Sequence, residues 1–304
     1  MMSTIIWPPI APAALAAETA SSLARELDWL LAELQDTLQS LKAGLSECAA
    51  LLAPSDTPST LALSSHRSEA LKGYVTRVGT HIVKGDVKLR LGSLPPPKGL
   101  AAYPLVVSGE PGAPVLALQQ LAAVRSRIDA CLDVVDVSTW AGDAKDAGFI
   151  AGQMRLLDVN LAEAKRMLKG EGDVGTQWWQ EPVDYNTFDP PLPSNVSFHL
   201  SIVDAALRLE IRTLEPATPP ADYHSAFSLN RLAVALGTVR VQHHDELGQT
   251  FTYKGHEVKV REKIRVESQD PNLMSALAKL NALERGVGLG RKALDIAMGR
   301  DGDE

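Results

Sequence analysis

The sequence predicts an elongated, two-domain α+β protein, in which an antiparallel four-helix, coiled-coil-like bundle and a separate antiparallel β-sheet domain are interleaved along the chain. Four long segments carry apolar residues at alternate spacings of three and four, which is typical of helical seams. Between them the period changes to two, which indicates half-buried strands. Aromatic residues make up only 5% of the chain while Ala and Leu abound, and this composition favours long helices packed side by side.

The first predicted helix runs from about Pro12 to Ala53, and the proline-rich stretch Pro54–Ser68 after it is expected to be a loop. The apolar seam of this helix extends over four heptads. It comprises Ala24, Leu27, Leu31, Leu34, Leu38, Leu41, Leu45, Cys48 and Leu52. Such a seam can dimerise as a leucine zipper or be covered within one chain. Because four seams in one chain can satisfy one another, we expect an intramolecular bundle and a monomer.

A first β block follows the loop. Alternating apolar and basic residues at Val87–Leu91 predict a half-buried strand, and residues 71–83 and 103–107 are strand-like as well. Gly79 and Gly85 are predicted turn or bulge positions. The solvent-facing charges of such strands need water, so we place them outside the bundle.

Two more helices are predicted within residues 114–169, one after Pro114 and one after Trp140. A long connecting loop, residues 170–194, then sets Trp178 and Trp179 side by side. These rings either dock onto the protein itself or expose an apolar surface suited to a partner. They are the candidate partner-binding residues.

The second β block starts at Asn195, and its first two strands are joined tightly at Asp204-Ala205. Its predicted strands are residues 196–203, 207–212, 234–241 and 258–266. Asp270 is the predicted N-cap and Pro271 the first residue of the last helix. Three glycines within that helix are expected to allow a close helix crossing, namely Gly286, Gly288 and Gly290.

The predicted domains are therefore discontinuous. The bundle is assigned residues 12–53, 114–169 and 271–298, and the β domain residues 71–108 and 195–267. Residues 1–11 and 299–304 are expected to be flexible tails.

Composition excludes several classes of protein. The 304 residues include 37 acidic and 30 basic side chains, a net charge of −7 that counts against a nucleic-acid binder. No apolar run is long enough to span a membrane, and Met1–Ala17, broken by prolines and without Lys or Arg, does not resemble a targeting segment. Cys48 and Cys131 lie on apolar stripes, so a reducing cytoplasmic location is expected.

No motif in the sequence indicates catalysis. The glycines of Gly170–Gly175 satisfy a dinucleotide-binding pattern, but the pattern follows a predicted helix where the mechanism needs a strand. The cluster His243–Glu246 could hold a metal if the chain folded back there, although a polar hairpin loop is the favoured interpretation. We expect no catalytic residue, no cofactor and no metal.

Three stretches in this order resemble the Rogdi leucine-zipper family: the opening helix at Glu26–Leu31, the strand region Leu71–Leu91, and Pro190–Asn195 leading into a hairpin. The resemblance covers roughly residues 23–297. That family includes the fungal second subunit of RAVE, the regulator of the ATPase of vacuolar and endosomal membranes. The sequence departs from the family in its proline-rich start, in residues 216–255 and in the twin tryptophans.

The resemblance implies a non-catalytic subunit of a RAVE-like complex that promotes assembly of the vacuolar-type proton-pumping ATPase. It further implies three kinds of partner: a large propeller-containing RAVE subunit, a Skp-type adaptor and peripheral-sector subunits of the pump. The protein would be cytoplasmic and recruited peripherally to vacuolar and endosomal membranes. Two alternatives stay open: a coiled-coil adaptor in membrane traffic, and a small-molecule-binding enzyme with a site between the two domains.

Overall fold

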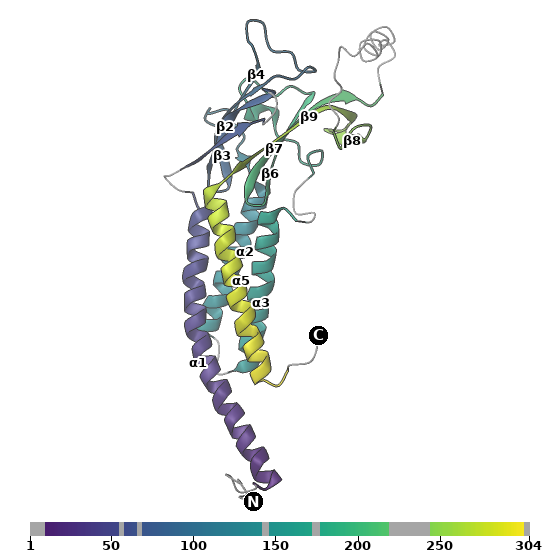
Figure 1. Cartoon of the computed structure of the whole chain (residues 1–304). Coiled ribbons are helices and arrows are strands. Elements are labelled where there is room, and N and C mark those ends of the chain that lie inside the picture. Colours follow the sequence, from purple (N-terminus) through teal and green to yellow (C-terminus); the bar gives the residue numbers. More distant parts are fainter. Residues whose placement is uncertain are drawn as a thin grey trace, which may run out of the picture. The chain divides into compact units, whose positions relative to one another are not determined.

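The computed structural model describes residues 10–54, 58–65, 69–141, 146–171, 177–218 and 244–300. Among them lie four α-helices that pack together and two antiparallel sheets, interleaved in sequence (Figure 1). The α+β class is as predicted, although the strands form two sheets rather than one. The chain divides into two compact units. The first comprises Met1–Ala49, Ser126–Ala164 and Ala278–Glu304, and the second Ala50–Arg125 and Lys165–Leu277.

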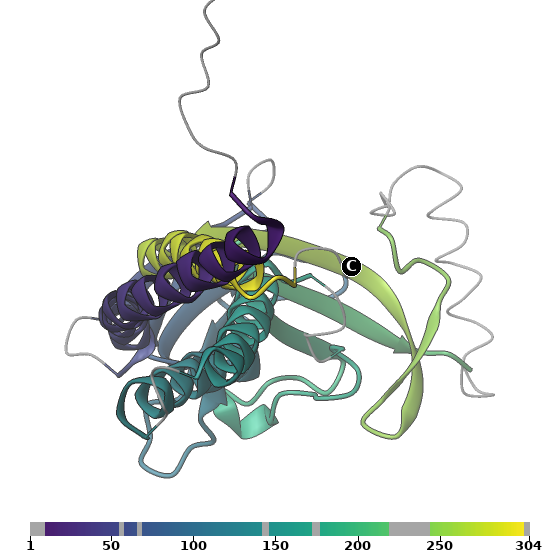
Figure 2. The same ribbon diagram turned by 90° about the horizontal axis from the view of Figure 1, so that it is seen from below.

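The helices are α1 (Pro12–Leu52), α2 (Gln119–Asp136), α3 (Ala147–Lys169) and α5 (Pro271–Ala297). Figure 2 shows α1 beside α5 and α2 beside α3. Ion pairs join neighbouring helices, namely Lys42–Asp136 at 2.6 Å, Arg127–Glu163 at 3.0 Å and Arg291–Asp158 at 2.8 Å.

The leucine seam of α1 is buried within the chain from Leu31 onward, whereas Ala24 is exposed and Leu27 only half-buried. Of the three glycines in α5, Gly290 alone lies at a close crossing, because a Cβ there would lie 2.9 Å from Met154 Cε. At Gly286 and Gly288 a Cβ would meet nothing within 4 Å.

The predicted cap of α5 is confirmed. The Asp270 carboxylate accepts a hydrogen bond from the backbone N–H of Asn272 at 2.9 Å, and Pro271 is the first helical residue. The other carboxylate oxygen accepts from Arg77 Nε at 2.7 Å, and both side chains are buried. The N-terminus of α5 is thus tied to strand β2 (Leu71–Val78).

The first sheet contains β2, β1 (Ser59–Ser64), β3 (His81–Leu89), β4 (Tyr103–Val106) and β5 (Leu116–Ala117), in the order β1-β2-β3-β4 with β5 also paired to β3. Gly79 lies in the predicted turn, here between β2 and β3, with a φ of 58°. The expectation of a loop over Pro54–Ser68 was wrong, because β1 forms there and pairs with β2. Its alternating Leu61 and Leu63 are buried, a pattern that the flanking prolines obscured.

The second sheet has the order β6-β7-β9-β8. Its strands are β6 (Val196–Val203), β7 (Ala206–Pro216), β8 (Thr250–Tyr253) and β9 (His256–Gln269). The tight turn at Asp204-Ala205 is confirmed, since both residues have positive φ, 49° and 58°, as a two-residue hairpin turn requires. The predicted strand 234–241 lies outside the described residues, and β8 was not predicted.

Candidate functional site

A buried ionic cluster occupies one face of the second sheet, and Arg212 of β7 is its centre. The Arg212 side chain is 2% exposed. Its Nε donates to Glu246 Oε2 at 2.7 Å, and its Nη2 donates to Glu246 Oε1 at 2.7 Å and to Glu210 Oε2 at 2.6 Å. Two carboxylates therefore hold one buried guanidinium in a forked geometry.

Neighbouring cations on β9 complete the cluster. Lys263 Nζ lies 2.8 Å from Glu246 and 2.9 Å from Asp245, and Arg265 Nε lies 2.7 Å from Glu210. The alternation of β7 and β9 produces this arrangement, because Arg212 is registered with Lys263 and Glu210 with Arg265. The three cations and three carboxylates of the cluster balance.

The charges of the cluster shift one another's protonation. Burial by itself raises the pKa of Glu210, but the neighbouring Arg212, Arg265 and Lys263 lower it to about 2. Burial and hydrogen bonds act in the same opposed way on Glu246, whose pKa is also lowered, and the hydrogen bond from Lys263 lowers the pKa of Asp245. The three carboxylates of the cluster are therefore ionised at neutral pH.

Two residues of the stretch His243–Glu246, for which a polar hairpin loop was favoured over a metal site, take part in this ionic cluster. Asp245 and Glu246 are bound by cations of the chain itself, and His243 lies outside the described residues. The structure forms no group of three or more potential metal-ligating side chains within the ranges it describes.

Trp178 and Trp179 dock onto the second sheet. Trp178 is 3% exposed, with its ring centroid 5.0 Å from Phe251 and 5.6 Å from Tyr253. Its ring also lies 4.9 Å from the Arg212 guanidinium. Trp179 is half-buried, 4.8 Å from Phe251. Both candidate residues thus contribute to the core around the ionic cluster, and a role in partner binding stays a prediction.

The dinucleotide-like pattern begins at the C-terminal end of α3. Gly170 follows Lys169, has a φ of 71°, and its N–H donates to the carbonyl of Met167 at 3.1 Å, as in a helix C-cap. Gly172–Thr176 lie outside the described residues. The position of Gly170 after a helix agrees with the interpretation that the pattern is accidental.

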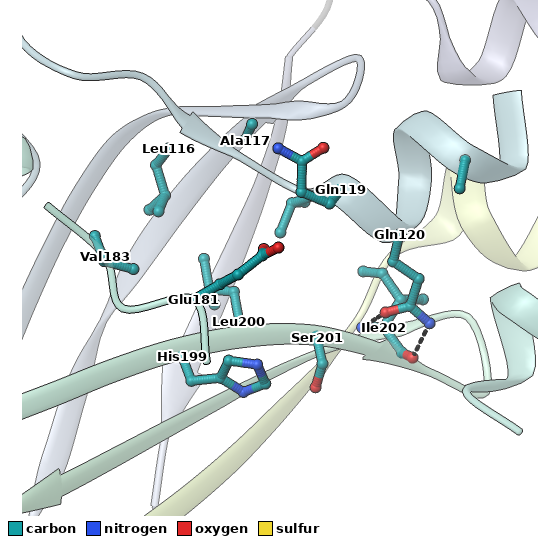
Figure 3. A pocket seen from close by; sticks show the side chains of 12 residues that line it. Leu116, Ala117, Gln119, Gln120, Glu181, Val183, His199, Leu200, Ser201 and Ile202 are labelled. Carbon is teal, nitrogen blue, oxygen red and sulfur yellow. Dashed lines mark hydrogen bonds between the residues drawn. The ribbon is translucent and has the colours of Figure 1, made fainter. Parts of the chain in front are cut away.

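A pocket of about 370 Å³ lies within the second unit, between β6 on one side and β5 with the start of α2 on the other (Figure 3). It is lined by Leu116–Gln120, Ala123, Glu181, Val183 and His199–Ile202. The sequence offered no sign of it, because its walls come from three separate segments of the chain that only the fold brings together.

The two ionisable side chains that line the pocket, Glu181 and His199, do not point toward each other. For nucleophilic catalysis, a nucleophile, a base and a carboxylate would have to be lined up within hydrogen-bond reach. Figure 3 shows the Glu181 carboxylate turned away from the His199 ring, toward the side of Gln119.

Elsewhere, burial raises the pKa of Cys48 to about 11 and that of Cys131 to about 12, so these thiols stay protonated at neutral pH.

Gln120 closes one end of the pocket. Its Nε2 donates to the carbonyl of Ile202 at 2.8 Å, and its Oε1 accepts from the N–H of Ile202 at 2.8 Å. The Nε2 group also donates to the carbonyl of Met167. The arrangement is suited to holding polypeptide backbone.

Over the part of the chain that the structure describes, every helix is too short or too polar to cross a membrane.

Comparison with known proteins identifies the family. Residues 26–295 match the family described as Rogdi leucine zipper containing protein. The chain is 22% identical over 286 residues to a protein of Schizosaccharomyces pombe named "Regulator of V-ATPase in vacuolar membrane protein 2", covering 88% of this chain and 92% of that protein. That relative's name is that of a regulator. The family match spans most of the present chain, and the chain therefore belongs to the Rogdi leucine zipper family.

Proposed function

We propose that this chain is a subunit of a RAVE-like complex that promotes assembly of the vacuolar-type proton-pumping ATPase through protein-protein contacts. The observation that carries the proposal is the similarity to the S. pombe regulator of V-ATPase, which extends over nearly the whole of both chains. Its partners would be a large propeller-containing RAVE subunit, a Skp-type adaptor and peripheral-sector subunits of the pump. It would act in the cytoplasm, at vacuolar and endosomal membranes, with no cofactor and no reaction of its own.

An uncovered stretch of α1 supports a function based on contacts. Before Leu31 every described residue of α1 is exposed or half-buried, and Figure 1 shows this part of the helix running on past the other three. Leu23 is 47% and Trp29 64% exposed. A helix that keeps leucines and a tryptophan in water is suited to binding a partner.

The same uncovered stretch favours a second candidate, a coiled-coil adaptor in membrane traffic. An adaptor would use α1 to bind a partner helix without any contact with the pump. Co-purification separates the two functions, because the pump subunits themselves are the distinguishing partners.

The experiment is affinity purification of the tagged full-length chain from its own cells at low salt, with mass spectrometry of the bound proteins. Three forms are compared: the unaltered chain, Leu23→Glu with Trp29→Glu on α1, and a matched control, Leu156→Glu with Val159→Glu on α3. All four side chains are exposed apolar residues of one bundle, so neither pair should unfold it.

We expect peripheral-sector pump subunits and a propeller-containing protein to bind the unaltered chain and the α3 variant, and to be lost from the α1 variant. Recovery of membrane-traffic proteins without pump subunits would favour the adaptor. If cross-linked samples of the unaltered chain contain the chain alone, the assembly function is refuted.

A further inference from the structure

The free edge of β6 directs backbone groups into the pocket. The turn at Asp204-Ala205 makes Val203 and Ala206 a hydrogen-bonded pair. Counting back from Val203, the N–H and C=O groups of every second β6 residue therefore face β7. Those of Ile202 and Leu200 therefore face away from β7. The bonds between Ile202 and Gln120 confirm this direction. Among the described strands, β7 is the one neighbour that pairs with β6.

Gln120 acts as a substitute for a neighbouring strand at one position of this edge. Its amide gives and receives one hydrogen bond at Ile202, as a residue of an added strand would do. The next outward-facing residue, Leu200, lines the pocket and has no such cover among the described residues. Edge groups of this kind are usually covered or blocked in stable proteins.

The opposite side of the pocket presents a second strand edge. Leu118 N–H donates to the carbonyl of Thr80 at 2.8 Å, and Ala117 is registered with His81. Leu118 and Thr80 are therefore a hydrogen-bonded pair. Because such pairs alternate with non-hydrogen-bonded pairs along an antiparallel ladder, Ala117 and His81 are a non-hydrogen-bonded pair. The N–H and C=O of Ala117 therefore face away from β3, and Ala117 lines the same pocket as Leu200.

An extended polypeptide is the ligand that matches two such edges. Successive residues of a strand direct their N–H and C=O groups to opposite sides, so one strand can pair with Leu200 on β6 and with Ala117 on β5. The volume of about 370 Å³ falls within the range of binding pockets, roughly 300–1,000 Å³. An added strand would join the two sheets.

The charge of the lining indicates which side chain the strand should carry. Glu181 is exposed at the pocket, and neither Lys nor Arg occurs among the lining residues. A basic residue of the ligand would therefore find an acidic counterpart and no lysine or arginine to repel it.

We propose that the groove between β5 and β6 receives an extended segment of a partner protein as an added β-strand, with a Lys or Arg of that segment facing Glu181. The inference goes beyond the proposed function and does not depend on it, because the groove is defined by backbone geometry within the second unit, whatever complex the chain joins.

The decisive variant is Leu200→Pro in the full-length chain. Proline removes the outward N–H and leaves the ladder between β6 and β7 intact, as edge strands tolerate. Leu200→Ala is the matched control, since it shortens the side chain but keeps the N–H. The probe is a displayed library of unstructured peptides of about ten residues, the length of a strand, from which selected peptides are synthesised.

We expect selected peptides to contain Lys or Arg and to bind the unaltered chain and Leu200→Ala with similar affinity. They should bind Leu200→Pro at least about tenfold more weakly, as the loss of a backbone hydrogen bond and the blocked edge require. Glu181→Gln should reduce affinity for the basic peptides more than for versions with neutral residues.

Amide hydrogen exchange tests the proposal without any variant. In the free chain the Leu200 amide should exchange much faster than those of His199 and Ser201, and peptide binding should slow it together with that of Ala117. A Leu200 amide already protected in the free monomer, or peptides that bind Leu200→Pro undiminished, would overturn the proposal. So would a dimer that dissociates in Leu200→Pro, because a second copy would then be the occupant.

Discussion

Replacing Arg212 by methionine should destabilise the second unit strongly. The change removes three short hydrogen bonds, one to Glu210 and two to Glu246, together with the contact over Trp178. Methionine fills much of the vacated volume, so the loss reports mainly on charge. It leaves two carboxylates in a site where burial penalises their ionised form.

The magnitude follows from what remains around those carboxylates. Breaking a buried ion pair by removing one partner costs about 3–5 kcal/mol. Here Lys263 stays 2.8 Å from Glu246 and Arg265 stays 2.7 Å from Glu210, so neither carboxylate is left without a cation. We therefore expect the lower end of the range, about 3 kcal/mol of unfolding free energy.

Arg208→Met is the matched control. Arg208 lies on the same strand and pairs with Glu267 at the same 2.7 Å distance, but its side chain is 24% exposed and that of Glu267 is 48% exposed. Exposed pairs contribute about 0.2–1 kcal/mol. In urea unfolding followed by circular dichroism, Arg212→Met should lower the midpoint by at least about 1 M, given slopes of about 1–3 kcal/mol per M. Equal midpoint shifts for the two variants would refute the argument from burial.

Three further predictions concern pH and the helices. Because the pKa of Glu210 is lowered from 4.5 to about 2, its contribution to stability is complete above about pH 4.5 and is lost as pH falls toward 2. At about 1.4 kcal/mol per pKa unit, this contribution amounts to about 3 kcal/mol. Glu210→Gln should therefore flatten the pH dependence of the unfolding free energy measured in urea. Leu34→Asp with Leu41→Asp should abolish the helical circular dichroism signal, since both side chains are buried in the bundle. If the variant instead keeps its helical signal and light scattering gives the mass of a monomer, the seam serves a dimer. Gly286→Ala should raise the thermal midpoint, because glycine in a helix interior costs about 0.8–1.0 kcal/mol relative to alanine. Gly290→Val should lower the midpoint, because the new Cβ would approach Met154. An equal response of the two sites would contradict the close crossing at Gly290.

The sequence predicts the local structure correctly where one periodicity or one cap residue decides it. The seam from Leu31 to Leu52, the cap at Asp270 and the turn at Asp204-Ala205 are each encoded within a few neighbouring residues, and the structure contains all three. The prediction was wrong at β1, where prolines on both sides of a six-residue strand suggested a loop. Short strands are decided by their pairing partners, and for β1 that partner is β2.

The sequence by itself determined the class of this protein, the order of its four long helices, and the family resemblance, because hydrophobic periods and capping residues act over short distances along the chain. Only the tertiary structure decided the rest. It brought Glu210 and Arg212 together with Glu246, docked Trp178 beneath them, and set Leu200 opposite Ala117 across one pocket. These contacts join residues from distant segments, and strand pairing and packing, which no local pattern encodes, establish them.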